Sequence, residues 1–340
     1  MKQMYPICEG QTKARRILWG NPQNTISWAF MKELRENNKT KKVYDIDPYV
    51  EVYQFRDNLY GLFNQNCDGA GDVWEYLIVG PEKALLIDTA FGLGDLKGLV
   101  NLIAEGKPVY VVNTHHHVDH AYGNCRFDKV YCHEYGVEET LKQNGHMFDY
   151  LFDEKGNCRW LEFDRNDLPS FRKYEVVGVP DGYVFNLGED WDVELIWTGG
   201  HAGGHAMLLD RKERIIFAGD CLCSDISGIG GGYAPNDVNW KYRNIFTYTS
   251  NLRRICARID EIDYVFPSHF MVNLESRVLL DELEACEAIL KNPEDYDYAE
   301  DHINAKDPTK KNRRLHKYIK GFSTISYNTE TGVFPPEEPN

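Results

Sequence analysis

Four apolar, strand-like runs in this chain of 340 residues stop at a histidine or an aspartate, or lead straight into a loop that contains one. "PVYVVNT" (108–114) leads into the cluster "HHHVDH", and "DVELIWTG" (192–199) leads into "GHAGGH". "RIIFAGD" (214–220) ends at an aspartate, and "YVFPSH" (264–269) ends at a histidine. In layered α/β folds, ligand sites collect at the edge where strands end. The pattern therefore predicts a layered α/β fold with a polar site at one edge.

The apolar pattern along the chain repeats in outline, with β-rich stretches followed by helical stripes in each half. This arrangement predicts two sheets packed together with helices outside. The expected parts are an N-terminal helical extension at 1–44, a main domain at 45–272 with a polar, aromatic insert at 145–175, and a C-terminal helix and tail at 273–340 packed on the same domain. The basic run "KKNRRLHK" (310–317) is interpreted as a solvated helix face.

The histidine cluster has the composition of a metal site rather than of a plain histidine tract. His115 and His117 lie two positions apart on one loop, so both imidazoles can converge on one cation. Asp119 and His120 follow and can serve a second cation beside the first. Because zinc is typically four-coordinate, two such ions need further ligands from distant segments. Residues of suitable type stand at three other strand ends: His201, Asp220 and His269.

This ordered set of histidines and aspartates resembles that of the metallo-β-lactamase-fold hydrolase superfamily, over residues of about 45–272. The resemblance implies an α/β fold, a four-layer αβ/βα sandwich of two mixed β-sheets with outer helices, and two metals at one edge. It assigns the metal ligands by position: His115, His117 and His201 to the first ion, Asp119, His120 and His269 to the second, and Asp220 to both. Asp88 in "LIDTA" matches the family's early strand-end aspartate, which supports ligands from behind.

The activity implied by this resemblance is hydrolysis. Two zinc ions about 3.5–4 Å apart can share a hydroxide, because metal binding lowers the pKa of water to about 7. We therefore expect a dinuclear zinc-dependent hydrolase of a small ester, thioester, lactone or amide, with the metal-bridging hydroxide as nucleophile. Asp119 and Asp220 are the expected catalytic carboxylates, with Asp119 able to pass a proton to the leaving group. Fe²⁺ or Mn²⁺ are the alternative metals.

Other functions stay open at this point. One is a mononuclear Fe(II) persulfide dioxygenase, which would rest on His115, His201 and Asp220 as a two-histidine, one-carboxylate triad. A second is a phosphodiesterase of a small substrate, and a third is a sensor that kept the metals without catalysis. Cys221 and Cys223 flank the shared aspartate, either as small buried thiols or as a source of a thiolate ligand.

Candidate substrate contacts come from the loops around the motif. Tyr122 stands where the family motif commonly has glycine, and His205 follows His201 by four residues, as a substrate contact or as support for a ligand. Tyr233 and Trp240 offer flat apolar surface on a glycine-containing loop. Together with the aromatic insert, they favour a partly apolar or aromatic small substrate, with ordinary packing under long loops as the alternative.

The balance of charge restricts the partners. With 53 acidic and 38 Lys and Arg residues, the formal net charge is −15, which disfavours nucleic acid and anionic membranes. The nine cysteines include no C-x-x-C pair and the N-terminus has no apolar leader, so we expect a reducing, cytoplasmic setting. The expected partner is a small-molecule substrate. The two terminal extensions are expected either to cover the pocket or to form a homo-oligomer contact.

Overall fold

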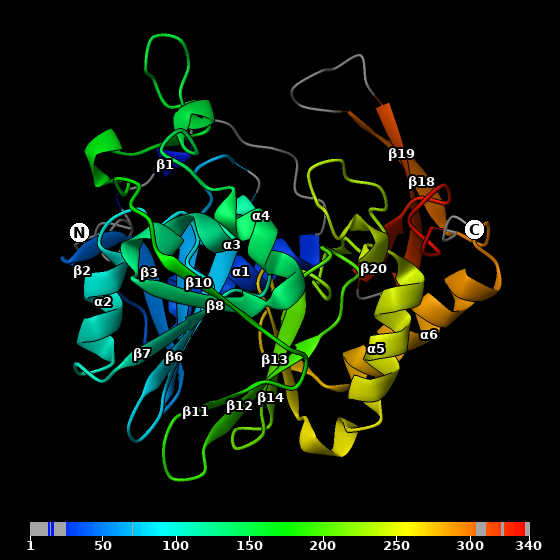
Figure 1. Ribbon diagram of the computed structural model, residues 1–340, viewed down its shortest axis with the longest axis horizontal. Coiled ribbons are helices and arrows are strands. Elements are labelled where there is room, and N and C mark those ends of the chain that lie inside the picture. The colour runs from blue at the N-terminus through cyan, green and yellow to red at the C-terminus, as the bar shows by residue number, and fades with distance from the viewer. Residues whose placement is uncertain are drawn as a thin grey trace, which may run out of the picture.

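The computed structural model describes residues 13, 15–16, 25–69, 71–303, 311–320 and 323–336. Two mixed β-sheets face each other, and helices cover their outer sides (Figure 1). The αβ/βα sandwich predicted from the sequence is therefore confirmed. No helix among the described residues is both long and apolar enough to cross a membrane.

The strand order of the two large sheets is as follows. The eight-stranded sheet runs β10 (Glu175–Val179), β8 (Lys129–His133), β7 (Val109–Val112), β6 (Ala84–Ile87), β5 (Asp72–Val79), β4 (Leu59–Gln65), β3 (Asp47–Arg56), β2 (Lys42–Tyr44). The six-stranded sheet runs β11 (Val184–Asn186), β12 (Asp192–Trp197), β13 (Ala206–Asp210), β14 (Ile215–Gly219), β16 (Tyr264–Pro267), β17 (Leu274–Glu275). Each sheet combines parallel and antiparallel pairs.

The core between these sheets is rich in aromatic side chains. Trp74 of β5 and Phe266 of β16 are fully buried there, in one cluster with residues from both sheets. Strands with both faces covered by other layers carry near-continuous apolar sequence, and all four residues of β6 are buried. The two sheets therefore share one buried core.

Helices cover the outer faces of both sheets (Figure 1). One side carries α2 (Leu96–Ile103), and the other carries α5 (Ile245–Cys256) and α6 (Arg277–Lys291). Asp95 caps α2 by accepting a hydrogen bond from Gly98 N, as a side-chain oxygen at a helix N-terminus commonly does. The remaining α-helices of the described residues are α1 (Thr25–Asn37), α3 (Val118–Ala121) and α4 (Val137–Leu141).

The C-terminal region contains a further sheet. A four-stranded sheet runs β15 (Ile226–Ser227), β20 (Ser323–Tyr327), β19 (Lys311–Ile319), β18 (Tyr298–Ile303). The helix interpretation of residues 310–317 is wrong over the part of that run that is described, because β19 occupies it. Leu315 and Ile319 are buried in the core, and a spacing of four fits one face of a helix and alternate positions of a strand equally well.

The N-terminal extension at 1–44 contributes helix α1, as predicted, and two further pieces. The short strand β1 (Arg15–Arg16) pairs with β9 (Leu161–Glu162) of the insert, and β2 lies at the edge of the large sheet. Phe30 and Leu34 of α1 pack against the central core. Residues 1–12, 14 and 17–24 of this prediction lie outside the described part of the chain.

Parallel pairing determines where the functional side chains lie. Strand β6 runs parallel to β7, and β14 runs parallel to β16, so the carboxyl ends within each pair meet at one edge. The two edges are tied to each other, because Ala206 N donates to Thr114 O at 2.9 Å across the sheets. The loops after β6, β7, β12, β14 and β16 therefore converge at one place.

Candidate metal centre

Three imidazole nitrogens meet at this edge and form a first group of donors. Nδ1 of His117 lies 3.0 Å from Nε2 of His115 and 2.9 Å from Nε2 of His201. His115 and His117 come from the loop after β7, whereas His201 comes from the loop after β12. Oδ2 of Asp220 lies 3.5 Å from Nε2 of His201 and 3.9 Å from Nε2 of His115. These four side chains could surround one cation.

A second group of donors lies beside the first. Nε2 of His120 is 3.2 Å from Oδ1 of Asp220, and Nε2 of His269 is 3.3 Å from the same oxygen. Each imidazole also lies 3.6 Å from an oxygen of Asp119. Asp220 therefore faces one group with Oδ2 and the other with Oδ1, as a carboxylate shared by two cations does. The structure thus brings the seven side chains that the resemblance assigned as ligands close together around Asp220.

Two buried polar atoms test whether a metal fits here. Nε2 of His120 and Oδ1 of Asp220 are buried 3.2 Å apart, and neither has a hydrogen-bond partner among the described residues. Burying such a group unpaired costs roughly 1–3 kcal/mol, so unpaired atoms of this kind call for a missing partner. Because both atoms face the second donor group, a cation there would satisfy both. The residues present therefore fit a pair of metal ions.

Electrostatics support the same conclusion. Burial lowers the pKa of His115, His117 and His201, which favours the neutral imidazoles that bind metals. Burial also opposes charge on His269, but the carboxylate of Asp220 outweighs this effect and raises its pKa to about 9. The second group therefore attracts positive charge, which a metal ion would supply.

Groups behind the imidazoles orient their ring nitrogens. Nδ1 of His201 donates to Gly228 O at 2.8 Å, and Nδ1 of His269 donates to Asp72 O at 2.6 Å. Because a carbonyl oxygen only accepts, Nδ1 carries the proton in both rings and Nε2 keeps its lone pair. Nδ1 of His120 contacts Oδ2 of Asp88 at 2.9 Å in the same way. These hydrogen bonds therefore orient Nε2 of all three rings toward the site.

Asp88 connects the second donor group to the first. Its Oδ1 accepts from Thr114 N and its Oδ2 accepts from Thr114 Oγ1, both at 2.8 Å. Because the hydroxyl proton of Thr114 is used on Asp88, its oxygen is left to accept from Nδ1 of His115 at 3.0 Å. Asp88 has φ +64°, a conformation that non-glycine residues rarely adopt and that clusters at functional sites. This placement agrees with the supporting role expected for it.

His205 is fully buried and lies behind Asp220. Its Nε2 accepts from Asp220 N at 3.2 Å, and its Nδ1 contacts Thr198 Oγ1 at 2.7 Å. Gly219 permits this approach, because it has φ +55° and a Cβ there would lie 2.4 Å from Nε2 of His205. Of the two roles expected for His205, its position supports the one of holding a ligand and not the one of contacting substrate.

The two cysteines beside Asp220 are packed away from the metal ligands. Sγ of Cys221 donates to Gly199 O at 3.3 Å, and the thiols of Cys221 and Cys223 are both buried. Burial raises the pKa of both thiols well above its usual value, so neither readily becomes a thiolate. The donor groups found among the described residues contain no cysteine.

An open cleft of about 710 Å³ reaches the two donor groups through His117 and Asp119. Tyr122 lines it as predicted, with its ring edge-on to Phe91 and to Phe148 of the insert. Tyr233 and Trp240 pack against each other with ring centroids 5.1 Å apart, and they are not among the residues that line the cleft. Other residues of their loop take this place, namely Ala234, Asn236 and Asp237.

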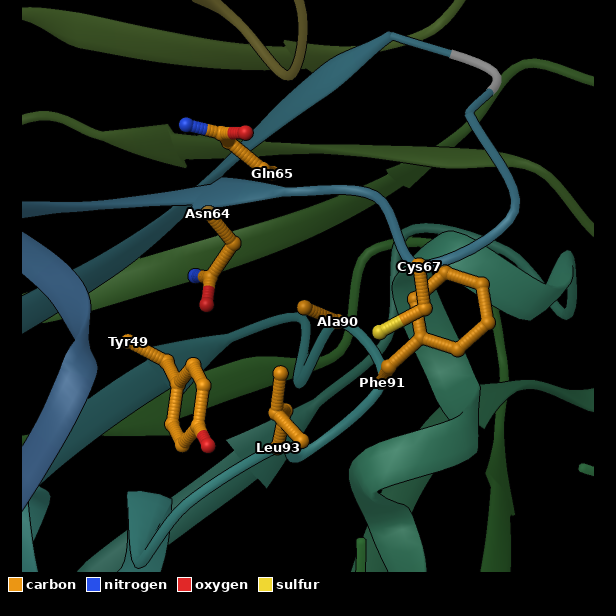
Figure 2. Close-up of a pocket in the computed structure, with 7 residues that line it drawn as sticks. All are labelled: Tyr49, Asn64, Gln65, Cys67, Ala90, Phe91 and Leu93. Atoms are coloured by element: carbon orange, nitrogen blue, oxygen red, sulfur yellow. The ribbon is translucent and has the colours of Figure 1, made fainter. Parts of the chain in front are cut away.

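A second, smaller cavity lies between β3, the end of β4 and the loop after β6. Its volume is about 10 Å³, which is the space that one water molecule needs. Figure 2 shows the side chains that line it, among them Tyr49, Asn64 and Leu93. Because this cavity is too small for a substrate, the larger cleft is the candidate substrate site.

Sequence reasoning missed two polar residues at the site. Nδ2 of Asn66, in the loop after β4, donates to Oδ2 of Asp119 at 3.1 Å and holds that carboxylate in place. Arg243, just before α5, lines the cleft, and its Nε donates to His201 O at 3.0 Å. Neither residue stands in a metal-ligand motif, so no local pattern marks them.

Comparisons with known proteins identify the family and several relatives. A family model described as the metallo-beta-lactamase superfamily matches residues 68–269. The acyl-coenzyme A thioesterase MBLAC2 of Homo sapiens is 28% identical over 222 residues, which cover 58% of this chain and 72% of that protein. The hydroxyacylglutathione hydrolase of Polaromonas sp. (strain JS666 / ATCC BAA-500) is 27% identical over 275 residues, with coverage of 78% and 89%. Among solved structures, a metallo-beta-lactamase from Pontibacter korlensis has 17% identity and a TM-score of 0.49, with coverage of 70% and 99%.

Proposed function

The chain belongs to the metallo-β-lactamase superfamily and is a metal-dependent hydrolase, and on that premise we propose that it hydrolyses a small-molecule thioester with the aid of two zinc ions. The observation that carries the dinuclear part is the position of Asp220, whose two oxygens face two separate donor groups. The thioester part is supported by the relatives, because both are named for hydrolysis of an acyl group on a thiol carrier.

The ligand types favour zinc over harder cations. Five of the seven donors are imidazoles, and the other two are carboxylates. Imidazole suits zinc, whereas magnesium and calcium prefer oxygen ligands throughout. Two zinc ions supply a hydroxide nucleophile at neutral pH and polarise the carbonyl oxygen of the substrate.

The protein's own residues would orient the reaction. Asp119 lines the cleft, and the hydrogen bond from Asn66 fixes Oδ2 of its carboxylate. A carboxylate held there could take the remaining proton of the nucleophile once it has added to the carbonyl, and pass that proton to the departing thiolate. Tyr122, whose ring packs on Phe91 and Phe148, would give the substrate one apolar wall of the cleft.

Metal analysis combined with a substrate panel tests this proposal. The purified protein would be assayed for zinc, iron and manganese, and then for turnover of matched thioesters, oxoesters, lactones and β-lactams. We expect about two zinc ions per chain, with thioesters hydrolysed fastest. A single iron per chain with no hydrolysis of any substrate would contradict the proposal.

Matched variants distinguish the metal ligands from nearby residues that do not bind metal. His269→Ala should lower the metal content and abolish turnover, because His269 belongs to the second donor group. Cys223→Ala should change neither, because the Cys223 thiol is buried and faces the backbone carbonyl of Gly219. Loss of metal from the cysteine variant would show that the ligand set is wrong.

A further inference from the structure

The carbonyl oxygen that orients His201 belongs to a loop and not to either of the two large sheets. We call this loop, residues 225–233, the backing loop. Gly228 O accepts from Nδ1 of His201 at 2.8 Å, and Gly228 directly follows β15. Strand β15 has two residues and pairs only with β20 among the described strands. Because Nε2 of His201 is a donor of the first group, the position of this loop bears on the metal site.

The C-terminal segment, residues 323–333, holds the backing loop at both ends. At the first end, β15 pairs in parallel with β20, and Oγ of Ser323 donates to Asp225 O at 3.1 Å. At the other end, Tyr233 N donates to Oγ1 of Thr331 at 2.9 Å. Both hydrogen bonds join residues that are 98 positions apart in the sequence. The loop therefore takes its position from a remote part of the chain.

Asn328 lies at the centre of this contact. Its Nδ2 donates to Gly231 O at 2.8 Å and to Gly230 O at 3.3 Å. Its Oδ1 accepts from Thr331 N at 2.9 Å and from Gly332 N at 3.1 Å. An amide side chain offers two N–H donors and an acceptor oxygen on one rigid group. Asn328 therefore ties the backing loop to the turn that follows β20.

The two segments meet closely enough that glycine is required at the contact. Gly230 has φ +76°, and a Cβ there would lie 2.6 Å from Gly332 O and 3.0 Å from Cβ of Tyr327. A residue with a side chain would therefore be strained in its backbone and would push the segments apart. The fit indicates that the contact is a fixed part of the fold.

We infer that the C-terminal segment is a positioning element of the metal centre, with Asn328 as its central residue. It acts through the backing loop: the segment fixes the loop, Gly228 O fixes Nδ1–H of His201, and Nε2 of that ring then faces the first cation. The inference rests on the proposed function, since it requires that the first donor group holds a metal. The segment lies outside residues 68–269, which the family model matches.

Asn328→Asp tests this inference, because it keeps Oδ1 and places an oxygen opposite Gly230 O and Gly231 O. Chelator competition would measure the affinity for each metal ion, and His201→Ala would identify which ion occupies the first position. We expect Asn328→Asp to bind the first ion about 10-fold more weakly and the second as tightly as the wild type. The matched control is Asn292→Asp, which adds the same charge at an exposed position after α6 and should change neither affinity.

A double variant separates positioning from a general loss of stability. With His201→Ala already present, Asn328→Asp should weaken binding of the first ion no further, because no imidazole is left to orient. A further loss there, an equal loss for both ions in Asn328→Asp alone, or an unchanged first affinity would overturn the inference. If Asn328→Asp does not fold, Ser323→Ala removes one hydrogen bond to the loop and should weaken the first ion about 3-fold, and an unchanged first affinity would again overturn the inference.

Failure of the thioesterase proposal would look different. The wild-type protein would then hydrolyse no thioester, or would bind a single iron, but affinity for the ion in the first donor group is measured without turnover. Asn328→Asp should still bind that ion about 10-fold more weakly than Asn292→Asp does. Equal affinities would overturn the inference whatever the reaction is, and a wild-type protein that binds no metal would overturn both proposals.

Discussion

Replacing Asp88 with asparagine would change one carboxylate oxygen, which accepts hydrogen bonds, into an NH2 group, which donates them. Asp88 lies where it contacts residues of both groups of candidate metal ligands. If the remaining oxygen keeps its bond from Thr114 N, the new amide faces Nδ1–H of His120 and the hydroxyl of Thr114. His120 can then avoid the clash by moving its proton to Nε2. That atom is the one that faces the second donor group, so its lone pair is lost.

The size of the effect follows from these contacts. Removing a group that orients a metal-binding histidine commonly weakens metal binding by about 10- to 100-fold, which is about 1.4–2.7 kcal/mol. The second metal should lose most, because His120 belongs to its ligands directly. The first metal is reached only through Thr114 and His115, so its affinity should fall less. Turnover should fall at least as much as occupancy of the second position.

Competition with a chromophoric chelator would measure both affinities, and turnover would be followed on the same samples. Asp210→Asn is a matched control, since Asp210 is also a buried aspartate and accepts from Trp191 Nε1 far from the ligands. It should alter stability without altering metal binding. If Asp88→Asn binds both metal ions as tightly as the wild type, the proposed control of the His120 tautomer by Asp88 is refuted.

Three further predictions concern single features of the site and the core. Asn66→Ala should lower kcat about 10-fold with little change in KM, because Asp119 loses the hydrogen bond that holds its Oδ2. Steady-state kinetics would measure both constants, and an unchanged kcat would contradict the prediction. Burial raises the pKa of Glu282 from 4.5 to about 8, so the stability that its protonated form contributes is complete below pH 4.5 and is lost as the pH rises to about 8. The free energy of unfolding in urea should therefore depend less on pH in Glu282→Gln than in the wild type, and parallel pH curves for the two proteins would disprove the burial effect. Removing metal with a chelator should lower Tm, because Oδ1 of Asp220 is then buried without a partner, and adding zinc should restore Tm. A Tm that does not respond to metal would count against a bound cation.

The histidine loop illustrates what could be read from the chain in advance. His115, His117, Asp119 and His120 are close in sequence, so their convergence is nearly a local property, and the apolar runs before the distant ligands are typical of buried strands. The basic run in 310–317 shows the opposite case. Its spacing of apolar residues fits a helix or a strand, and pairing with β18 and β20 decided the matter.

The residue types at strand ends predicted by themselves a layered α/β fold and a set of candidate metal ligands, because metal chemistry admits few side chains and those side chains follow buried strands. Only the tertiary structure decided which groups stand behind and beside them. Asn66 and Arg243 belong to no motif, and His205 lies behind Asp220 although its spacing gave no sign of it. Hydrogen bonds between remote segments exist only once the chain is folded, so no pattern within one segment records them.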